Sequence, residues 1–539
     1  CSCLPSSHAR TRRGAAGNVE EVEISPGIDH IAWVDGAGHR SACAGGACGR
    51  LRLRGPTTDI LRYRAFAPHT RARFHDIYSV ERLIGEGSYG NVYEAVARAP
   101  PMELSAGDTR RVAVKCFNLS RPAGRQESDP EALCQDPDVQ RSSFETERLL
   151  LAHTEHPHIV KMFECFEERD RCWIVMELCT GGEVYDCVAD RASLGTGIGL
   201  QEPEASRLFQ QMVQAVSYLH SRQIVHRDIK TENFLLLGPP GSRDHGVVKL
   251  CDFGTAVQLT PEQPRALERI GTLSYTAPEI YQKLGATTAA DVWSLGVVLY
   301  VLLLGASPFR TTGQEPAQDT VDRIVLGGYD TSRPAWPTLS SAARELVCQL
   351  LVVDETARPA GVAVLRHPWL RLEQRVLSTA LGAPTASARL AHLAPFAPRV
   401  LELVQDFADL DLLQQLALAV CARMTPETEI LGLQPSIPWY ELFLAFDARG
   451  DGHVEPLSFA TGMRALLGAP RSPDEEDLRA LAEALDIDGS GSIDWGEWAS
   501  LALLSAEGRG LSMQTMLSAF RAVDRPTGDG AIGLSDLLA

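Results

Sequence analysis

The spacing of hydrophobic positions changes along this chain. Between residues 78 and 118, apolar side chains such as Val80, Leu83 and Val92 fall in short runs around a glycine-rich turn, which predicts β-strands. The stretch WIVMEL (173–178) predicts a further strand. After about residue 200, stretches such as SRLFQQMVQAVSYLH place apolar residues three and four positions apart, which predicts helices. Strands that precede most of the helices are typical of an α+β fold with a β-rich part and a helical part.

Changes in this pattern divide the chain into four regions. The first is a low-complexity extension rich in Gly, Ala, Arg and Ser, with one strand-like piece at 19–25, and we expect it to be largely disordered. The second carries the strands and then the helices, the third is a helical linker, and the fourth alternates helices with loops. The four regions span residues 1–73, 78–370, 372–435 and 436–539.

The composition narrows the classes of function. The chain has 539 residues and a formal net charge of −18. Nucleic-acid binding needs a basic face, so we expect no nucleic-acid partner. The thirteen cysteines are scattered, which favours free thiols in a reducing, cytoplasmic compartment.

The longest apolar run, 292–305, is too short to cross a bilayer and predicts a buried helix. We expect peripheral membrane attachment only if a missing Met-Gly supplies an acylation signal beside Cys1 and Cys3.

A glycine-rich stretch and a lysine indicate a phosphate site. Residues 85–92 read GEGSYGNV, and small glycines let backbone N–H groups approach phosphates closely. Lys115 follows in the strand-like VAVK, where its ammonium can hold phosphates. A carboxylate is needed to orient Lys115, and the spacing favours Glu147 over the competing Glu145.

The stretch HRDIKTENFLL (226–236) gives the strongest catalytic signal. Asp228 is placed to accept the proton of an acceptor hydroxyl, and Lys230 to stabilise a transferred phosphoryl group. Asn233 and, in CDFG, Asp252 are the predicted magnesium ligands. TAPE (276–279) closes the segment that follows.

Together these motifs resemble the catalytic domain of eukaryotic protein kinases, over about residues 78–370. The resemblance implies a bilobal α+β fold with a small β-rich lobe and a large helical lobe. Lys230 after HRDI resembles serine/threonine kinases, which use ATP and Mg²⁺. The resemblance to protein kinases also implies that Asp291 braces the catalytic loop and that Glu279 pairs with Arg358. The implied nucleotide contacts are Ile84, Gly85, Glu86, Gly87, Ser88, Tyr89, Gly90, Asn91, Val92, Ala113, Lys115, Glu147, Met176, Glu177 and Cys179.

Two further predictions concern the substrate and activation. Glu183 and Glu232 match positions that receive an upstream arginine in basophilic kinases, so we expect substrates with a basic residue before the Ser or Thr. Glu268 stands where many kinases carry a phosphorylated threonine, and Arg227 usually binds that phosphate. We therefore expect a Glu268–Arg227 pair and activity without phosphorylation of this segment.

Residues 486–497, DIDGSGSIDWGE, match the EF-hand calcium motif. Gly491 holds the sixth place, Ser492 binds through its backbone carbonyl, and Glu497 binds with both carboxylate oxygens. The predicted calcium ligands are Asp486, Asp488, Ser490, Ser492, Asp494 and Glu497.

Two further acidic loops, 447–458 and 524–536, recur at nearly equal spacing and indicate a repeat of this unit. In the first, Arg449 puts a cation at a ligand place and Ser458 cannot bind with two oxygens, so we expect weak or no calcium binding. The last loop is one residue too long and the chain ends soon after it, so we expect a truncated C-terminus and a missing fourth hand.

A kinase domain followed by a helical junction and EF-hands resembles the calcium-dependent protein kinases of plants and alveolate protists. The resemblance implies that residues 395–425 inhibit the kinase until the EF-hand module binds them. The family's junction is usually basic, whereas this one carries acids such as Asp406. Capture through an apolar face and a plain structural helix both stay open. The four residues that carry the apolar spacing i, i+3, i+4 and i+7 are Val400, Leu403, Val404 and Phe407.

We therefore expect a calcium-regulated serine/threonine kinase that uses ATP, Mg²⁺ and Ca²⁺ and acts on protein substrates. One complete loop at ten times its dissociation constant shifts an equilibrium by RT ln 11, about 1.4 kcal/mol, which predicts a shallow calcium response. Two alternatives stay open: a calcium-independent kinase with vestigial EF-hands, and a calcium-sensing scaffold with a dead kinase fold.

Overall fold

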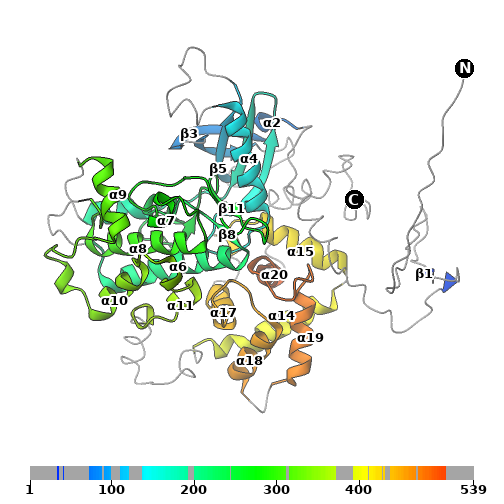
Figure 1. The fold of residues 1–539 in the computed structure, drawn as a ribbon. Helices are drawn as coiled ribbons and strands as arrows, with labels where there is room; N and C mark the ends of the chain where they lie inside the picture. Colours follow the sequence, from blue (N-terminus) through cyan, green and yellow to red (C-terminus); the bar gives the residue numbers. More distant parts are fainter. Residues whose placement is uncertain are drawn as a thin grey trace, which may run out of the picture. The chain divides into compact units, whose positions relative to one another are not determined.

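The computed structural model is drawn in Figure 1. A first unit, Cys1–Arg52, contains the paired strands β1 (Trp33–Val34) and β2 (Arg40–Ser41). All other described elements belong to the second unit, Leu53–Ala539. The predicted strand at 19–25 and the third acidic loop lie outside the described residues. Those residues are 33–34, 40–41, 72–87, 90–98, 110–120, 136–191, 199–242, 244–310, 315–371, 392–410, 412–427, 429–430, 437–468 and 472–505.

A five-stranded antiparallel sheet forms the small lobe, with strand order β3-β4-β5-β7-β6. Helix α4 packs against β5, β6 and β7; Pro137 stands at its first position, and the Asp136 carboxylate accepts the Asp138 N–H as an N-cap. The strand predicted at 173–178 ends earlier, because its pairing with β5 stops at Met176 opposite Ala113. The elements are α2 (Phe74–Ile77), β3 (Tyr78–Gly87), β4 (Gly90–Ala97), β5 (Arg111–Asn118), α4 (Pro137–Ala152), β6 (Met162–Glu167) and β7 (Arg171–Met176).

Helices dominate the large lobe. The apolar run at 292–305 lies almost entirely in α8, whose residues from Ala290 to Leu304 are all buried, so the predicted buried helix is confirmed. Within the described part of the chain, no helix is both long and apolar enough for a membrane span. The helices are α5 (Val184–Arg191), α6 (Glu202–Ser221), α7 (Pro278–Tyr281), α8 (Thr288–Leu304), α9 (Ala317–Leu326), α10 (Ser341–Leu350) and α11 (Gly361–Val364).

Short elements fill the remainder of the large lobe and carry most of the functional loops. The strands are β8 (Ile224–Val225), β9 (Phe234–Leu236), β10 (Val248–Leu250) and β11 (Val257–Gln258). The 3₁₀ turns are η2 (Thr231–Asn233), η3 (Trp336–Thr338), η4 (Glu355–Ala357) and η5 (Pro368–Arg371).

The C-terminal region has a core of its own, here called the regulatory module (residues 392–505). All four apolar positions of the junction are buried in this core, and α14 contacts α18, α19 and α20. Val454 and Ile493 pair through two backbone hydrogen bonds and join the first two acidic loops, as in paired EF-hands. The elements are η6 (Ala394–Phe396), α14 (Ala397–Asp409), α15 (Leu412–Met424), α17 (Trp439–Phe446), α18 (Pro456–Leu467), α19 (Glu475–Leu485) and α20 (Trp495–Ser505).

The regulatory module contacts the kinase-like region through polar and aromatic groups. Arg423 forms an ion pair with Glu155 at 2.7 Å, and its Nη2 donates to Ala152 O at 2.6 Å. His453, in the first acidic loop, stacks on Tyr218 of α6 with ring centroids 5.3 Å apart. The two regions therefore share a specific interface.

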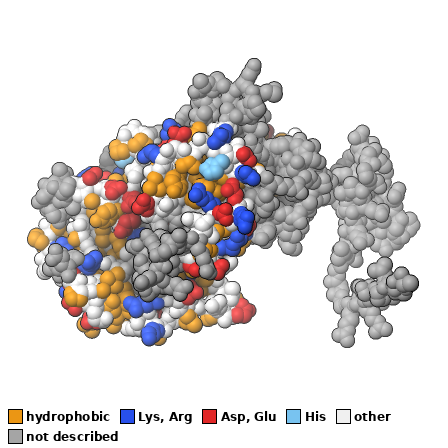
Figure 2. Space-filling view, turned by 90° about the horizontal axis from the view of Figure 1, so that it is seen from above, with side chains coloured by type: hydrophobic (Ala, Val, Ile, Leu, Met, Phe, Trp, Pro, Cys, Tyr) orange, Lys and Arg blue, Asp and Glu red, His pale blue; other side chains and the backbone are white. Residues whose placement is uncertain are grey.

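Figure 2 shows one face of the molecule, on which acidic side chains stand in small groups among basic and hydrophobic ones. On this face the described charges therefore form no broad patch of one sign.

Candidate active site and calcium loops

The glycine-rich turn joins β3 to β4, with Gly87 opposite Gly90. Gly90 has a φ of +148°, and a Cβ there would lie 2.6 Å from the backbone oxygen of Cys116. Only glycine fits this position, so the backbone can come close to a neighbouring group. The predicted contacts Ser88 and Tyr89 lie outside the described residues, while Val92 pairs with Lys115 in the next strand.

Lys115 is held between two carboxylates. Its Nζ lies 2.7 Å from Glu147 Oε2 and 2.7 Å from Asp252 Oδ1. Glu147 is therefore the partner, as the spacing predicted, while Glu145 pairs with Arg148. Burial opposes ionisation of Asp252, yet the Lys115 ammonium outweighs it and holds the pKa of this carboxyl at about 2. Asp252 is thus an anion paired with a cation.

Asp228 accepts from several donors at the base of the site. Lys230 Nζ lies 2.6 Å from Asp228 Oδ2, and Asn233 Nδ2 donates to the Asp228 backbone oxygen at 2.8 Å. Thr272 donates to Asp228 Oδ1 from its backbone N–H at 3.0 Å and from its hydroxyl at 2.7 Å. These contacts fix the carboxylate that would accept the proton of an acceptor hydroxyl.

The two bracing pairs that the resemblance implied are present. Asp291 accepts the backbone N–H groups of His226 and Arg227, each at 2.9 Å, so it holds the chain just before Asp228. Glu279 and Arg358 form a buried, two-pronged ion pair with both contacts at 2.7 Å.

The site fits Mg²⁺ by its donor chemistry. The side chain of Asp252 is 36% exposed although the carboxyl lies beside the buried Lys115. Asn233 uses its amide nitrogen toward Asp228, and its amide oxygen is the group of this side chain that can bind a cation. Carboxylate and amide oxygens are ligands that Mg²⁺ accepts.

The remaining nucleotide positions surround this centre. Ile84, Gly85 and Glu86 lie on β3, and Asn91 lies on β4. Met176 is the buried last residue of β7, opposite Ala113 on β5. The hinge, residues 177–179, follows directly; Glu177 is buried and Cys179 is half-buried. The predicted residues thus converge on the junction of the two lobes.

Glu183 and Glu232 lie close enough for their charges to interact. Burial, followed by the charges of Asp186 and Glu232, raises the pKa of Glu183. Glu232 Oε2 accepts from the hydroxyl of Thr231 at 2.9 Å. Two mutually repelling carboxylates favour a cation between them, as the basophilic prediction requires.

The predicted contact between Arg227 and Glu268 is present. Arg227 Nη1 lies 3.1 Å from Glu268 Oε2, while Arg227 Nε donates to Thr255 O at 2.6 Å. The carboxylate thus lies beside the arginine that precedes Asp228.

The loop 486–497 assembles a candidate calcium site. Carboxylate oxygens of Asp486, Asp488 and Glu497 lie within 4.8 Å of one another. Burial, together with the nearby Asp488, raises the pKa of Asp486 to about 6. Asp494 Oδ1 accepts the Glu497 N–H at 2.9 Å, and Ser490 Oγ donates to Ser492 O. Crowded carboxylates of this kind gain from a divalent cation, so the donor set fits Ca²⁺.

The first acidic loop carries its own cation. Arg449 Nε lies 3.1 Å from Asp451 Oδ2, and Arg449 Nη2 lies 2.9 Å from Glu455 Oε1. Asp447 accepts the N–H groups of Gly450 and Gly452 at 2.7 and 2.8 Å, much as Asp486 accepts those of Ser490 and Gly491. The Arg449 ion pairs, which place a cation among the acids, support the prediction of weak or no calcium binding at 447–458.

Comparison with known proteins agrees with this geometry. A family model described as protein kinase domain matches residues 78–370. This chain belongs to the protein kinase family. The kinase is 30% identical over 433 residues to calcium-dependent protein kinase 11 of Oryza sativa subsp. japonica, covering 80% of the chain and 65% of the relative.

Two further relatives carry the same description. Calcium-dependent protein kinase 8 of Arabidopsis thaliana is 29% identical over 80% of the chain and 70% of the relative. Calcium-dependent protein kinase 3 of Plasmodium yoelii yoelii is 27% identical over 88% of the chain and 76% of the relative. The chain spans about two thirds of the length of the first of these relatives. The resemblance to plant and alveolate calcium-dependent kinases is confirmed.

Two features of the kinase were missed from the sequence. Thr272 holds Asp228, and the sequence signal was its place just after Gly271, ahead of TAPE. A buried charge cluster behind the hinge includes Glu427 of the regulatory module. Its sequence, TPETEI, gives no sign of burial.

Proposed function

We propose that this chain is a calcium-regulated serine/threonine protein kinase that transfers the γ-phosphate of ATP to protein substrates. The observation that carries the proposal is the set of contacts around Asp228: Lys230, Thr272 and, at 3.2 Å, Asn233 Nδ2 all contact the carboxylate and hold it in one position. The Lys115–Glu147 pair completes the arrangement on the other side of the site.

The chemistry follows from these positions. Asp228 accepts the proton of the substrate hydroxyl, while Lys230, 2.6 Å away, supplies positive charge for the transferred group. Lys115 is oriented by Glu147 toward the nucleotide phosphates. Mg²⁺, held by Asn233 and Asp252, would neutralise phosphate charge when bound. Positioning and electrostatics are the main contributions that a protein makes to phosphoryl transfer.

Glu183 and Glu232 would receive a basic residue upstream of the target Ser or Thr. A guanidinium binds carboxylates with directed hydrogen bonds, and the mutual repulsion of the two acids adds to the gain.

Regulation would act through the state of the junction. Within the regulatory module, helix α14 packs its buried apolar face against α18, α19 and α20, so we infer that this arrangement is the uninhibited one. Calcium at 486–497 would favour it, because Glu497 belongs to α20, which contacts both α14 and α15. The first acidic loop, with Arg449 as an internal cation, would serve docking through His453. The cytoplasmic location stays a prediction.

The test is phosphate transfer from ATP to a serine peptide with an upstream arginine, measured with calcium and with chelator. Asp228→Asn is the control that should lose transfer under both conditions. We expect transfer that rises with calcium. Equal transfer in both conditions would favour the calcium-independent kinase, and no transfer by a folded, nucleotide-binding chain would favour the scaffold.

A further inference from the structure

Four buried charged side chains form a cluster behind the hinge. Lys161 precedes β6, and Glu177 is the first residue of the hinge. Lys249 lies on β10, three residues before Asp252. The fourth, Glu427, comes from the regulatory module just after α15. Each side chain is at most 6% exposed, so water contributes little to their solvation.

The distances join the four groups into one unit. Lys249 Nζ lies 2.9 Å from Glu177 Oε1 and 4.0 Å from Glu427 Oε2. Lys161 Nζ lies 3.4 Å from Glu427 Oε2 and donates to the backbone oxygens of Ala422 and Thr425, both at 3.2 Å. The Lys161 backbone N–H also donates to Glu177 Oε1 at 2.7 Å. Glu427 thus contacts both lysines that surround the hinge glutamate.

Charge balance depends on Glu427. Of these four groups, the kinase domain contributes two ammonium groups and one carboxylate, and Glu427 brings the sum of the four charges to zero. Among the described residues neither oxygen of Glu427 has a hydrogen-bond donor, so the two ammonium charges are what holds it. Burial opposes the charge of Lys249, but Glu177 and Glu427 outweigh it and raise its pKa.

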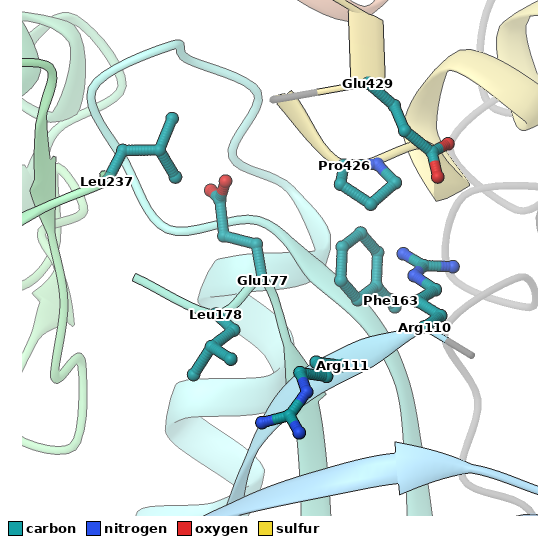
Figure 3. A pocket seen from close by; sticks show the side chains of 8 residues that line it. All are labelled: Arg110, Arg111, Phe163, Glu177, Leu178, Leu237, Pro426 and Glu429. Atoms are coloured by element: carbon teal, nitrogen blue, oxygen red, sulfur yellow. The ribbon is translucent and has the colours of Figure 1, made fainter. Parts of the chain in front are cut away.

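The cavity in Figure 3 shows how near the regulatory module lies to the hinge. Glu177 and Leu178 line it on the kinase side, and Pro426 and Glu429 line it on the regulatory side, with Phe163 between them. Its volume is about 180 Å³. The segment that carries Glu427 therefore lies directly behind the hinge.

We propose that Glu427 is a positioning residue for ATP, acting through Glu177 and the hinge. When the regulatory module is docked, Glu427 neutralises the charge of Lys161, so Glu177 pairs with Lys249 without competition from Lys161. The hinge backbone at Glu177 is then fixed for the adenine. When the module leaves, both lysines compete for Glu177 and the hinge shifts. This inference rests on the proposed function, because the hinge is taken to hold ATP.

The test uses the full chain and two measurements: binding of a fluorescent ATP analogue, and steady-state transfer with varied ATP. In Glu427→Gln we expect the Kd of the analogue and the KM for ATP to rise about tenfold, the factor that corresponds to 1.4 kcal/mol, with kcat at saturating ATP within about twofold. Glu402→Gln is the matched control on an exposed face of α14, and it should change neither value.

A second substitution separates positioning from general damage. Lys161→Met removes one ammonium, so the cluster then carries one excess negative charge, and adding Glu427→Gln restores neutrality. We expect Glu427→Gln to weaken ATP binding in the wild-type chain but to leave or tighten it in the Lys161→Met chain. The opposite effects of Glu427→Gln on ATP binding in the two chains are expected even if Glu427→Gln alone lowers the melting temperature.

The proposal is overturned if Glu427→Gln lowers kcat without changing the Kd of the analogue. It is also overturned if the two substitutions weaken ATP binding additively. Binding of the analogue does not require phosphate transfer, so an inactive wild-type chain would refute the proposed function while the analogue still tests Glu427.

Discussion

Replacing Glu268 by Gln tests whether a carboxylate takes the place of a phosphate in the activation segment. The contact at stake joins Glu268 Oε2 to Arg227 Nη1 at 3.1 Å. Arg227 precedes Asp228 in the chain, so the contact ties the activation segment to the catalytic loop. Glutamine keeps the shape and removes the charge.

The exposure of the two side chains sets the magnitude. The Glu268 side chain is 73% exposed and that of Arg227 is 8% exposed, so water and salt screen the pair strongly. Ion pairs with an exposed partner contribute about 0.2–1 kcal/mol, which corresponds to a factor of about 1.4 to 5 in a population or rate. Arg227 also keeps its 2.6 Å bond to Thr255 O in the variant. We therefore expect kcat/KM to fall by at most about fivefold.

The assay is kcat/KM for an arginine-containing peptide at low and high ionic strength. High salt should bring the wild-type kinase toward Glu268→Gln, because screening weakens the same pair that the substitution removes. Glu262→Gln, an exposed acid in the same segment, is the control and should have no effect. An unchanged kcat/KM in Glu268→Gln at low salt would refute the pairing argument, and a loss beyond about a hundredfold would show that Glu268 does something other than screen Arg227.

Three further predictions test the calcium loop, the substrate acids and the interface. Glu497→Gln should abolish stimulation by calcium and leave activity in chelator unchanged, as a calcium titration of transfer would show. Glu232→Gln should lower kcat/KM about tenfold or more for an arginine peptide but not for its alanine analogue, since a hydrogen bond to a charged group contributes about 1.5–3 kcal/mol. Burial lowers the pKa of His158 to about 3, so its stabilising contact with Tyr440 is fully present above its ordinary value of about 6.5 and is lost as the pH falls toward 3. The free energy of unfolding, measured by thermal denaturation, should therefore fall by about 1.4 kcal/mol for each pH unit below about 6.5. It should fall less steeply in His158→Gln.

Local patterns carried much of the fold and site. The pairing of Lys115 with Glu147 followed from spacing, because the strand and helix that carry them have fixed positions in a kinase-like motif set. The apolar face of α14 followed from its period alone, and all four predicted positions are buried. Strand ends were less certain: Glu177 was placed in a strand but lies just beyond β7, because pairing with β5 ends at Met176.

Contacts between the regulatory module and the kinase domain could not be predicted, because nothing near either partner in the sequence encodes them. His453 on Tyr218 depends on how the first acidic loop meets α6. Glu427 resembles an exposed turn residue until Lys161 and Lys249 are placed beside it. A charged side chain is rarely buried without a partner, so its location becomes meaningful only in three dimensions.

The proposed role of Glu427 would also link calcium binding to the nucleotide site. A buried carboxylate is stable here only while Lys161 and Lys249 surround it, and those lysines are balanced only while it is present. Docking of the regulatory module and the pairing of charges behind the hinge are therefore coupled to each other. Helix α20, which carries Glu497, packs on α15, which ends three residues before Glu427. On the proposed role of Glu427, calcium that stabilises the docked module would also strengthen ATP binding, and ATP would then strengthen calcium binding by the same factor.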